Sequence, residues 1–222
     1  MRITTQMLNE SARQAGLPIN RSTLLDYIKN DGATNPLLEA MNRNKENVAN
    51  TAKKSNYEKL DKEADQLTQS AQVLLQNGEN SLFEQAKACG DNQKVYDSIE
   101  NLFENYNSTL KALRTTSNTM NDFYRQMLLE APAETKEGLA GVGITFAKDG
   151  TATVDMEKVK AADFATLEGL LGKDSDFVNK VEFLSTRISD NAEANVESLS
   201  SAYNSGGNLY SAMNSSKYDF WG

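Results

Sequence analysis

Few side chains in this sequence are suited to chemistry, and two carboxylates around one turn are the first to consider. Asp149 and Asp155 lie in and after the segment Lys148-Asp149-Gly150, where they could offer oxygen ligands to Ca²⁺. A calcium-binding loop needs several oxygens at close spacing, as in D-x-[DN]-x-[DN]-G, and only these two are present. We therefore expect Asp149 to be a turn residue and Asp155 a helix N-cap, with no metal and no cofactor.

The remaining candidates for reactivity are Cys89 and the carboxylates of residues 61–65 (DKEAD). The cationic residues near Cys89 in sequence are Lys87 and Lys94, and a small residue at a helix end is favoured over a redox thiol. Paired carboxylates can hydrolyse glycosides, but those of 61–65 alternate with lysine and suit a solvated helix face.

The sequence contains no histidine, and this removes the commonest general base and metal ligand. We expect no catalytic residue and a protein that is not an enzyme, with a histidine-free hydrolase as the least favoured class. The net charge of −8 argues against nucleic acid and anionic membrane surfaces as partners.

No window approaches the roughly 18–20 apolar residues that span a bilayer, so no membrane insertion is expected. The opening MRITTQMLNESARQAG has no apolar segment or cleavage site of a Sec signal peptide. We expect a chain that is either cytosolic or exported by a route that reads no cleaved signal.

Three stretches carry apolar residues at spacings of three and four, which places one stripe along a helix. The first seam, in a helix expected over 37–76, is Tyr57, Leu60, Ala64, Leu67, Ala71 and Leu74. The second seam, in a helix expected from about Asp91 to Leu129, is Ile99, Phe103, Tyr106, Leu110, Leu113, Met120, Tyr124 and Met127. The third seam, in a helix starting near Ser175, is Phe177, Val181, Leu184 and Ile188.

These seams predict the fold class. It is mainly α, with long antiparallel helices in a helical bundle or coiled coil, because consecutive seams joined by a short break near Gly78 can pack on each other. The stripes could instead assemble with other subunits, but pairing within the chain is favoured.

One short β-hairpin interrupts the helical pattern at about 142–154. Apolar residues alternate on both sides of the turn, and Gly150 is expected to take a positive φ. A helix should begin after Asp155 and end at Gly172. Since an isolated two-stranded hairpin is marginally stable in water, this one must pack on a helix.

The expected organisation has three parts. An N-terminal helical arm covers 1–36, a helical core covers 37–205, and an aromatic tail covers 206–222. The tail ends in Tyr218, Phe220 and Trp221, which could dock in a partner's groove or fold back over an end of the core. Both alternatives remain open at this point.

The segments IENLFENYNSTLKAL (99–113), LAGVGITFAKDGTATVDMEKVKAA (139–162) and LGKDSDFVNKVEFL (171–184) resemble, in this order, the C-terminal core of bacterial flagellar filament-capping proteins of the hook-associated family. The similarity covers roughly residues 95–205. The matching positions are Phe103, Tyr106, Asn107, Gly143, Ile144, Asp149, Gly150, Asp155, Lys158, Lys160, Val178 and Phe183.

The opening MRITTQM is also similar to the start of hook–filament junction proteins. The large β-rich domains of the capping family have no counterpart here, so the resemblance is to a shortened relative. It implies a hairpin lying beside a helical coiled coil in a core between subunits.

The resemblance implies a non-enzymatic flagellar structural or assembly protein, whose seam residues pack with other flagellar subunits or with further copies of the chain. It would belong to the bacterial flagellum and leave the cell by the flagellar type III export route. The alternative is a cytoplasmic helical adaptor or export chaperone for a flagellar protein, which the acidic balance and the aromatic tail would suit.

Overall fold

The computed structural model describes residues 10, 14, 15 and 36–204. The chain divides into two compact units, Met1–Val48 and Ala49–Gly222, and the side chains considered below belong to the second. The predicted tail at 206–222 and nearly all of the predicted arm at 1–36 lie outside the described residues.

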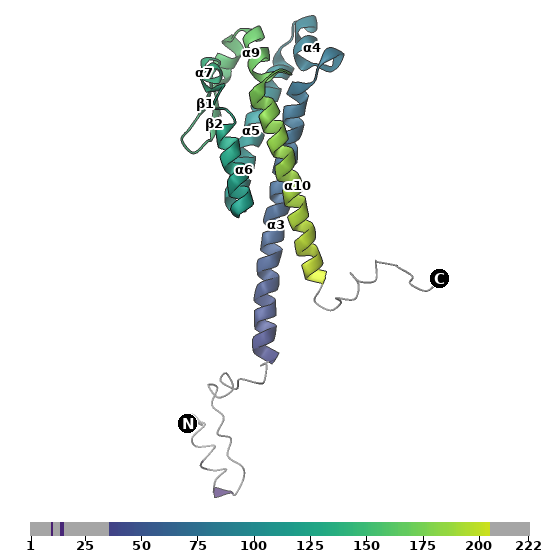
Figure 1. Cartoon of the computed structure of the whole chain (residues 1–222), viewed down its shortest axis with the longest axis vertical. Helices are drawn as coiled ribbons and strands as arrows, with labels where there is room; N and C mark the ends of the chain where they lie inside the picture. The colour runs from purple at the N-terminus through teal and green to yellow at the C-terminus, as the bar shows by residue number, and fades with distance from the viewer. Residues whose placement is uncertain (1–9, 11–13, 16–35, 205–222) are drawn as a thin grey trace, which may run out of the picture. The chain divides into compact units, whose positions relative to one another are not determined.

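The described part of the chain is mainly helical with one two-stranded antiparallel sheet, which confirms that part of the expected fold class (Figure 1). In order, the elements are α3 (Pro36–Leu75), η1 (Gly78–Asn80), α4 (Leu82–Cys89), α5 (Gln93–Thr115), α6 (Thr119–Glu130), α7 (Lys136–Gly141), β1 (Ile144–Phe146), β2 (Ala152–Val154), α8 (Met156–Ala161), α9 (Phe164–Leu171) and α10 (Asp176–Asn204).

Local signals in the sequence account for several helix ends. The side chain of Ser81 accepts a hydrogen bond from the backbone N–H of Glu84 at the start of α4. Asp155 caps α8 in the same way, as expected, and Asp163 caps α9. These side chains pair backbone donors that the first turn of a helix leaves without partners.

The prediction of a single helix from Asp91 to Leu129 is wrong, because the helix is interrupted between the end of α5 at Thr115 and the start of α6 at Thr119. The side chain of Asn118 accepts from the backbone N–H of Asn121 and starts a new helix there. The break shifts the buried face by one position, so that Asn121 and Leu128 are buried. Met120 and Met127, expected in the seam, are 50% and 39% exposed.

Two further stretches are more divided than expected. The helix predicted after Asp155 is split into α8 and α9, since Asp163 caps a second helix. The short break near Gly78 holds both η1 and α4, and α4 buries Phe83, whose ring lies 5.6 Å from that of Phe164 in α9.

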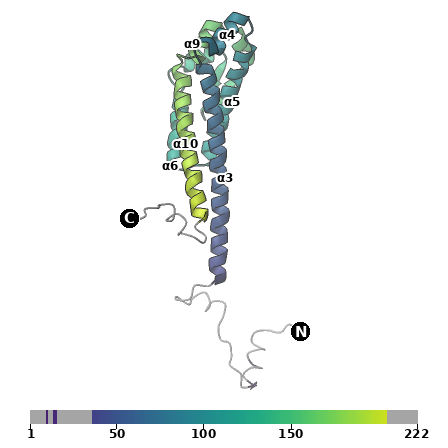
Figure 2. The same ribbon diagram turned by 90° about the vertical axis from the view of Figure 1, so that its right-hand side faces the viewer.

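Within the unit from Ala49 onward, α3, α5 and α10 lie side by side (Figures 1 and 2). The hydroxyl of Thr68 in α3 donates to Ser185 in α10 at 2.8 Å, and Gln72 donates to Glu182. Later residues of α3 therefore meet earlier residues of α10. Helix α3 also contacts α5, where the hydroxyl of Thr109 donates to the carbonyl of Glu63 at 3.0 Å.

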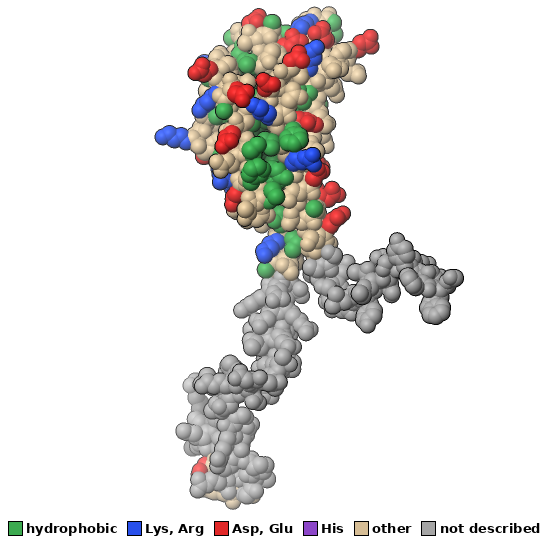
Figure 3. All heavy atoms as spheres, viewed as in Figure 1, with side chains coloured by type: hydrophobic (Ala, Val, Ile, Leu, Met, Phe, Trp, Pro, Cys, Tyr) green, Lys and Arg blue, Asp and Glu red, His purple; other side chains and the backbone are tan. Residues whose placement is uncertain are grey.

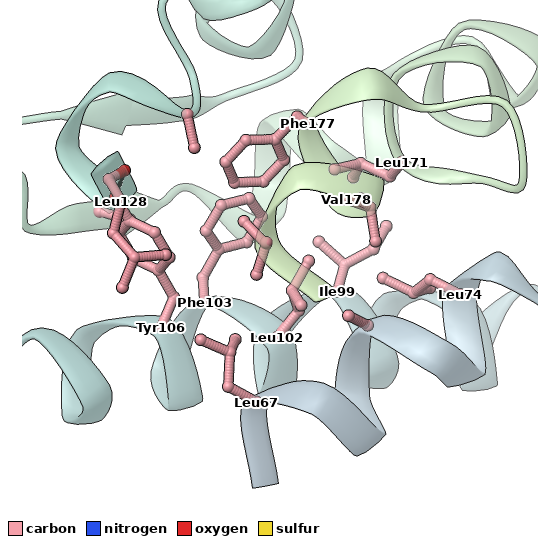
Figure 4. Packing of buried hydrophobic residues seen from close by; sticks show 14 of the residues in the cluster. Leu67, Leu74, Ile99, Leu102, Phe103, Tyr106, Leu128, Leu171, Phe177 and Val178 are labelled. Atoms are coloured by element: carbon pink, nitrogen blue, oxygen red, sulfur yellow. Dashed lines mark hydrogen bonds between the residues drawn. The ribbon is translucent and has the colours of Figure 1, made fainter. Parts of the chain in front are cut away.

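The three seams meet in one hydrophobic core (Figure 4). Apart from the displaced residues of α6 and the half-buried Tyr57, the seam residues are buried. The large buried side chains of the three seams are Leu60, Leu67, Leu74, Ile99, Phe103, Tyr106, Leu110, Leu113, Phe177, Val181, Leu184 and Ile188. These side chains are thus covered by their own chain, and the identity of the residues that pack against partner subunits stays a prediction.

Candidate functional site

The place where the hairpin packs on α5 is the candidate site, and we call it the hairpin anchor. It consists of Phe103, Tyr106, Asn107 and Arg114 of α5 together with the parts of the hairpin that they contact. Three residue pairs define the register of the hairpin, Ile144↔Val154, Thr145↔Thr153 and Phe146↔Ala152. Ile144 and Ala152 are buried against the core.

The hairpin turn has the geometry expected from Lys148-Asp149-Gly150. The backbone N–H of Gly150 donates to the carbonyl of Ala147, and Gly150 has a φ of +83°. A three-residue loop that ends on a glycine of positive φ matches the twist of the flanking strands. A Cβ on Gly150 would also lie 1.8 Å from Leu129 Cδ2, so the turn sits directly against α6.

Asn107 fixes strand β2 to α5 through its side-chain amide. Its Nδ2 donates to the carbonyl of Ala152 at 2.8 Å, and its Oδ1 accepts from the Ala152 N–H at 2.8 Å. The amide thus pairs both polar groups of one backbone residue, as a neighbouring strand would. Because Ala152 is only 5% exposed, water could replace these bonds only in part.

We expect Asn107→Ala to lower the free energy of unfolding by about 2 kcal/mol, since it leaves a buried N–H and a buried carbonyl without partners. Hydrogen exchange followed by NMR should show faster exchange of the Ala152 amide. Asn101→Ala is the matched control, because Asn101 lies on the same helix and is exposed. An unchanged Ala152 exchange rate in Asn107→Ala would contradict the assigned role.

Aromatic rings join the hairpin to two helices at the hairpin anchor. The Phe103 and Phe177 rings stack with centroids 5.8 Å apart, and Phe146 of β1 lies edge-on to Tyr106 at 5.9 Å. Figure 4 shows Phe103, Tyr106 and Phe177 pointing toward one another from α5 and α10. Stacked and edge-to-face pairs of this kind add to the stabilisation from burial alone.

The hydroxyl of Tyr106 reaches through this cluster to a third element. It donates to the carbonyl of Leu128 near the end of α6 at 2.8 Å, and the side chain is fully buried. Burial raises the pKa of the Tyr106 phenol well above its ordinary value. Tyr106 therefore remains protonated in the folded protein at a pH where an exposed tyrosine ionises.

This shift predicts a loss of stability in alkali. Above about pH 10 the phenol ionises in the unfolded chain but keeps its proton in the folded one, so the unfolded state binds fewer protons. Unfolding should then become more favourable by about 1.4 kcal/mol per pH unit from this group. Denaturant titrations between pH 9 and about 11.5 should show this slope. In Tyr106→Phe, the free energy of unfolding should lose the part of its pH dependence that one buried tyrosine contributes. An identical pH dependence in the two proteins would contradict it.

Both carboxylates considered for Ca²⁺ have protein partners. Asp149 accepts from the backbone N–H and the hydroxyl of Thr151, and Arg114 donates to it. The bonds from Thr151 first, and then the Arg114 guanidinium, hold the pKa of Asp149 below its ordinary value. The N–H of Lys158 and its ammonium lower the pKa of Asp155 in the same way. The two residues thus act as a turn residue and an N-cap.

The other sequence candidates lie apart from the hairpin anchor. Cys89 is exposed at the end of α4. In the segment 61–65, Asp61 and Asp65 lie 2.6 and 2.8 Å from the hydroxyl of Ser189 in α10, so this face is partly in contact with another helix. Among the residues with described placement, no group of three or more His, Cys, Asp and Glu could hold a metal ion.

A hollow of about 660 Å³ beside α4 has Glu79, Glu84 and Glu168 among the residues that line it. Lys87 pairs with two of them, at 3.2 Å from Glu84 and 2.7 Å from Glu168. The hydrogen bond to Glu168, followed by that to Glu84, raises the pKa of Lys87. Lys87 thus connects α4 to α9 through its ion pair with Glu168.

The sequence patterns did not reveal the exposed apolar face of α6. Met120, Phe123 and Met127 lie on one face of this helix at spacings of three and four, and we call them the α6 stripe; Phe123 is 56% exposed. Asn118, which follows Ser117, is the signal in the sequence for a new helix start, because Asn is a preferred N-cap. The new start changes which face of α6 is exposed.

Most positions that carry the resemblance converge on the hairpin anchor. Phe103, Tyr106 and Asn107 contact the hairpin from α5, and Gly143 accepts the backbone N–H of Asp155 at 2.9 Å where the hairpin meets α8. Two positions lie elsewhere on α10. Val178 is buried in the core, and Phe183 is exposed with the Arg187 guanidinium 5.4 Å from its ring centroid.

No helix among the described residues is both long enough and apolar enough to cross a membrane. Searches against family models, curated proteins and solved structures find no match to this chain.

Proposed function

We propose that this chain is a non-enzymatic structural or assembly protein of the bacterial flagellum, related in its core to the filament-capping proteins that its sequence resembles. It would act by packing its helices against partner subunits, and would leave the cell by the flagellar export route.

The observation that carries the proposal is the construction of the hairpin anchor. The residues shared with the resembled family are scattered over the sequence, yet most of them hold one hairpin on one helix through ring contacts, an amide pair and a helix cap. Such contacts hold the hairpin in one place on the helix. This supports a protein in which the residues that carry the resemblance stabilise the fold, as expected of an assembly subunit.

The proposal includes a finer description of the fold. We infer that α3, α5 and α10 act as a long antiparallel bundle, because the hydrogen bonds of α3 to each partner helix join residues in opposite order. The seams fill the interior of this bundle, so the surface that meets other subunits must be formed by other residues.

Fractionation of the source bacterium tests the proposal. Filaments sheared from the cells, washed and probed with an antibody against this chain should contain it, and cells without a working flagellar export apparatus should retain it inside. Recovery only from the cytosol, bound to one exported flagellar protein, would contradict a filament role and establish the alternative of an adaptor or export chaperone. A chain found in neither association would contradict both.

A further inference from the structure

The α6 stripe is an apolar surface that the described part of the chain leaves open to solvent. Met120, Phe123 and Met127 are 50%, 56% and 39% exposed, although the opposite face of the helix is buried against the core. Figure 3 shows hydrophobic side chains gathered in a patch between α6 and the adjoining part of α10. Contiguous exposed apolar patches commonly mark interaction sites.

We propose that the aromatic end of this same chain, Tyr218, Phe220 and Trp221, docks on the α6 stripe. This inference does not rest on the flagellar role. It selects one of the two alternatives that the sequence left open for the tail and names the surface that receives it.

The distance between the two segments fits this arrangement. Asn191 of α10 donates to Asn121 of α6 at 3.1 Å, so α10 passes the start of the stripe there. From Asn191 to Asn204 a helix rises about 20 Å. Residues 205–217 can span at most about 45 Å when extended. A flexible Gly- and Ser-rich linker of this length has an r.m.s. end-to-end distance of about 20 Å.

A linker whose r.m.s. length equals the span gives the highest effective concentration, at the millimolar level for short linkers. Weak contacts are therefore sufficient for docking within one chain. Residues 205–217 are largely Gly, Ser and Asn, which is the composition of such a linker.

The side chains on the two sides are chemically matched. The α6 stripe offers two thioethers and one ring, and the tail offers three rings. Methionine sulfur packs favourably against aromatic rings, and the flexible Met side chain adapts to irregular shapes. Aromatic anchors in such surfaces supply most of the binding energy.

Charge favours the tail over a second copy of the chain as the occupant. Residues 205–222 carry one Lys and one Asp, so their net charge is zero. Two whole chains each carry a net charge of −8 and repel one another. The tail, with no net charge, can contact the acidic remainder of the chain without this electrostatic repulsion.

Trp221 is the only tryptophan, so its fluorescence reports directly on the docked state. The unaltered protein should show emission shifted to the blue of a solvated tryptophan, with reduced quenching by acrylamide, and neither property should change with protein concentration. Phe123→Ser should lower the docking equilibrium constant about tenfold and move both properties toward the solvated values.

Val73→Ser is the matched control, because Val73 is also an exposed hydrophobic residue but lies on α3 in a groove facing α5. It should leave Trp221 emission unchanged, and far-UV circular dichroism should verify that both variants are folded. Solvated emission in the unaltered protein would overturn the proposal. A blue shift that is unchanged in Phe123→Ser would also overturn it. A blue shift that increases with protein concentration would overturn it too, and would indicate that a second copy of the chain covers the α6 stripe.

Discussion

Replacing Phe103 by alanine is expected to lower the free energy of unfolding by about 3–5 kcal/mol, the range for large aromatic truncations in a packed core. Phe103 is 1% exposed and contacts rings from two other elements, at 5.8 Å for Phe177 and 6.1 Å for Phe146. The cavity would therefore open where α5, α10 and the hairpin meet.

Equilibrium denaturation by urea, followed by far-UV circular dichroism, measures this effect. Phe123→Ala is the matched control, since it removes the same side chain from a site that is 56% exposed and should cost less than about 1 kcal/mol. Similar losses in the two variants would mean that the aromatic cluster at the hairpin anchor does not stabilise the fold as described.

The seams were predictable from sequence because a helix returns to the same face at fixed intervals. Spacing alone identified Leu60, Ile99 and Phe177 as buried, and each is fully buried. The hairpin turn was predictable for a similar local reason, since a Lys-Asp-Gly segment between alternating apolar residues has few other conformations. In both cases the deciding interactions lie within a few residues of each other.

The interactions that unite these elements were not predictable in the same way. The partner of Asn107 is Ala152, which is 45 residues away, and no repeat in the sequence connects them. The break before α6 was missed because apolar residues continue the heptad spacing through it. There the local preference of Asn118 for an N-cap prevailed over the pattern, and the register of Met120 and Met127 turned outward.

Gly143→Ala is the second substitution with a large expected effect, because two independent terms oppose it. Gly143 has a φ of +94°, which residues with a Cβ avoid at a cost of about 1–2 kcal/mol. A Cβ there would also lie 2.6 Å from Lys158 Cβ and 2.9 Å from the carbonyl oxygen of Asp155. Neither atom is at the flexible end of a side chain, so the hairpin or α8 must move.

We expect Gly143→Ala to lower the free energy of unfolding by about 3–5 kcal/mol, the sum of backbone strain and overpacking. Two control variants separate these terms in the same urea titration. Gly78→Ala introduces a side chain at a φ of +64° with open space around it and should cost only about 1–2 kcal/mol. Gly141→Ala has open space and no positive φ, and should change stability by less than about 1 kcal/mol. If Gly143→Ala cost no more than Gly78→Ala, the close approach of the hairpin to α8 would be refuted.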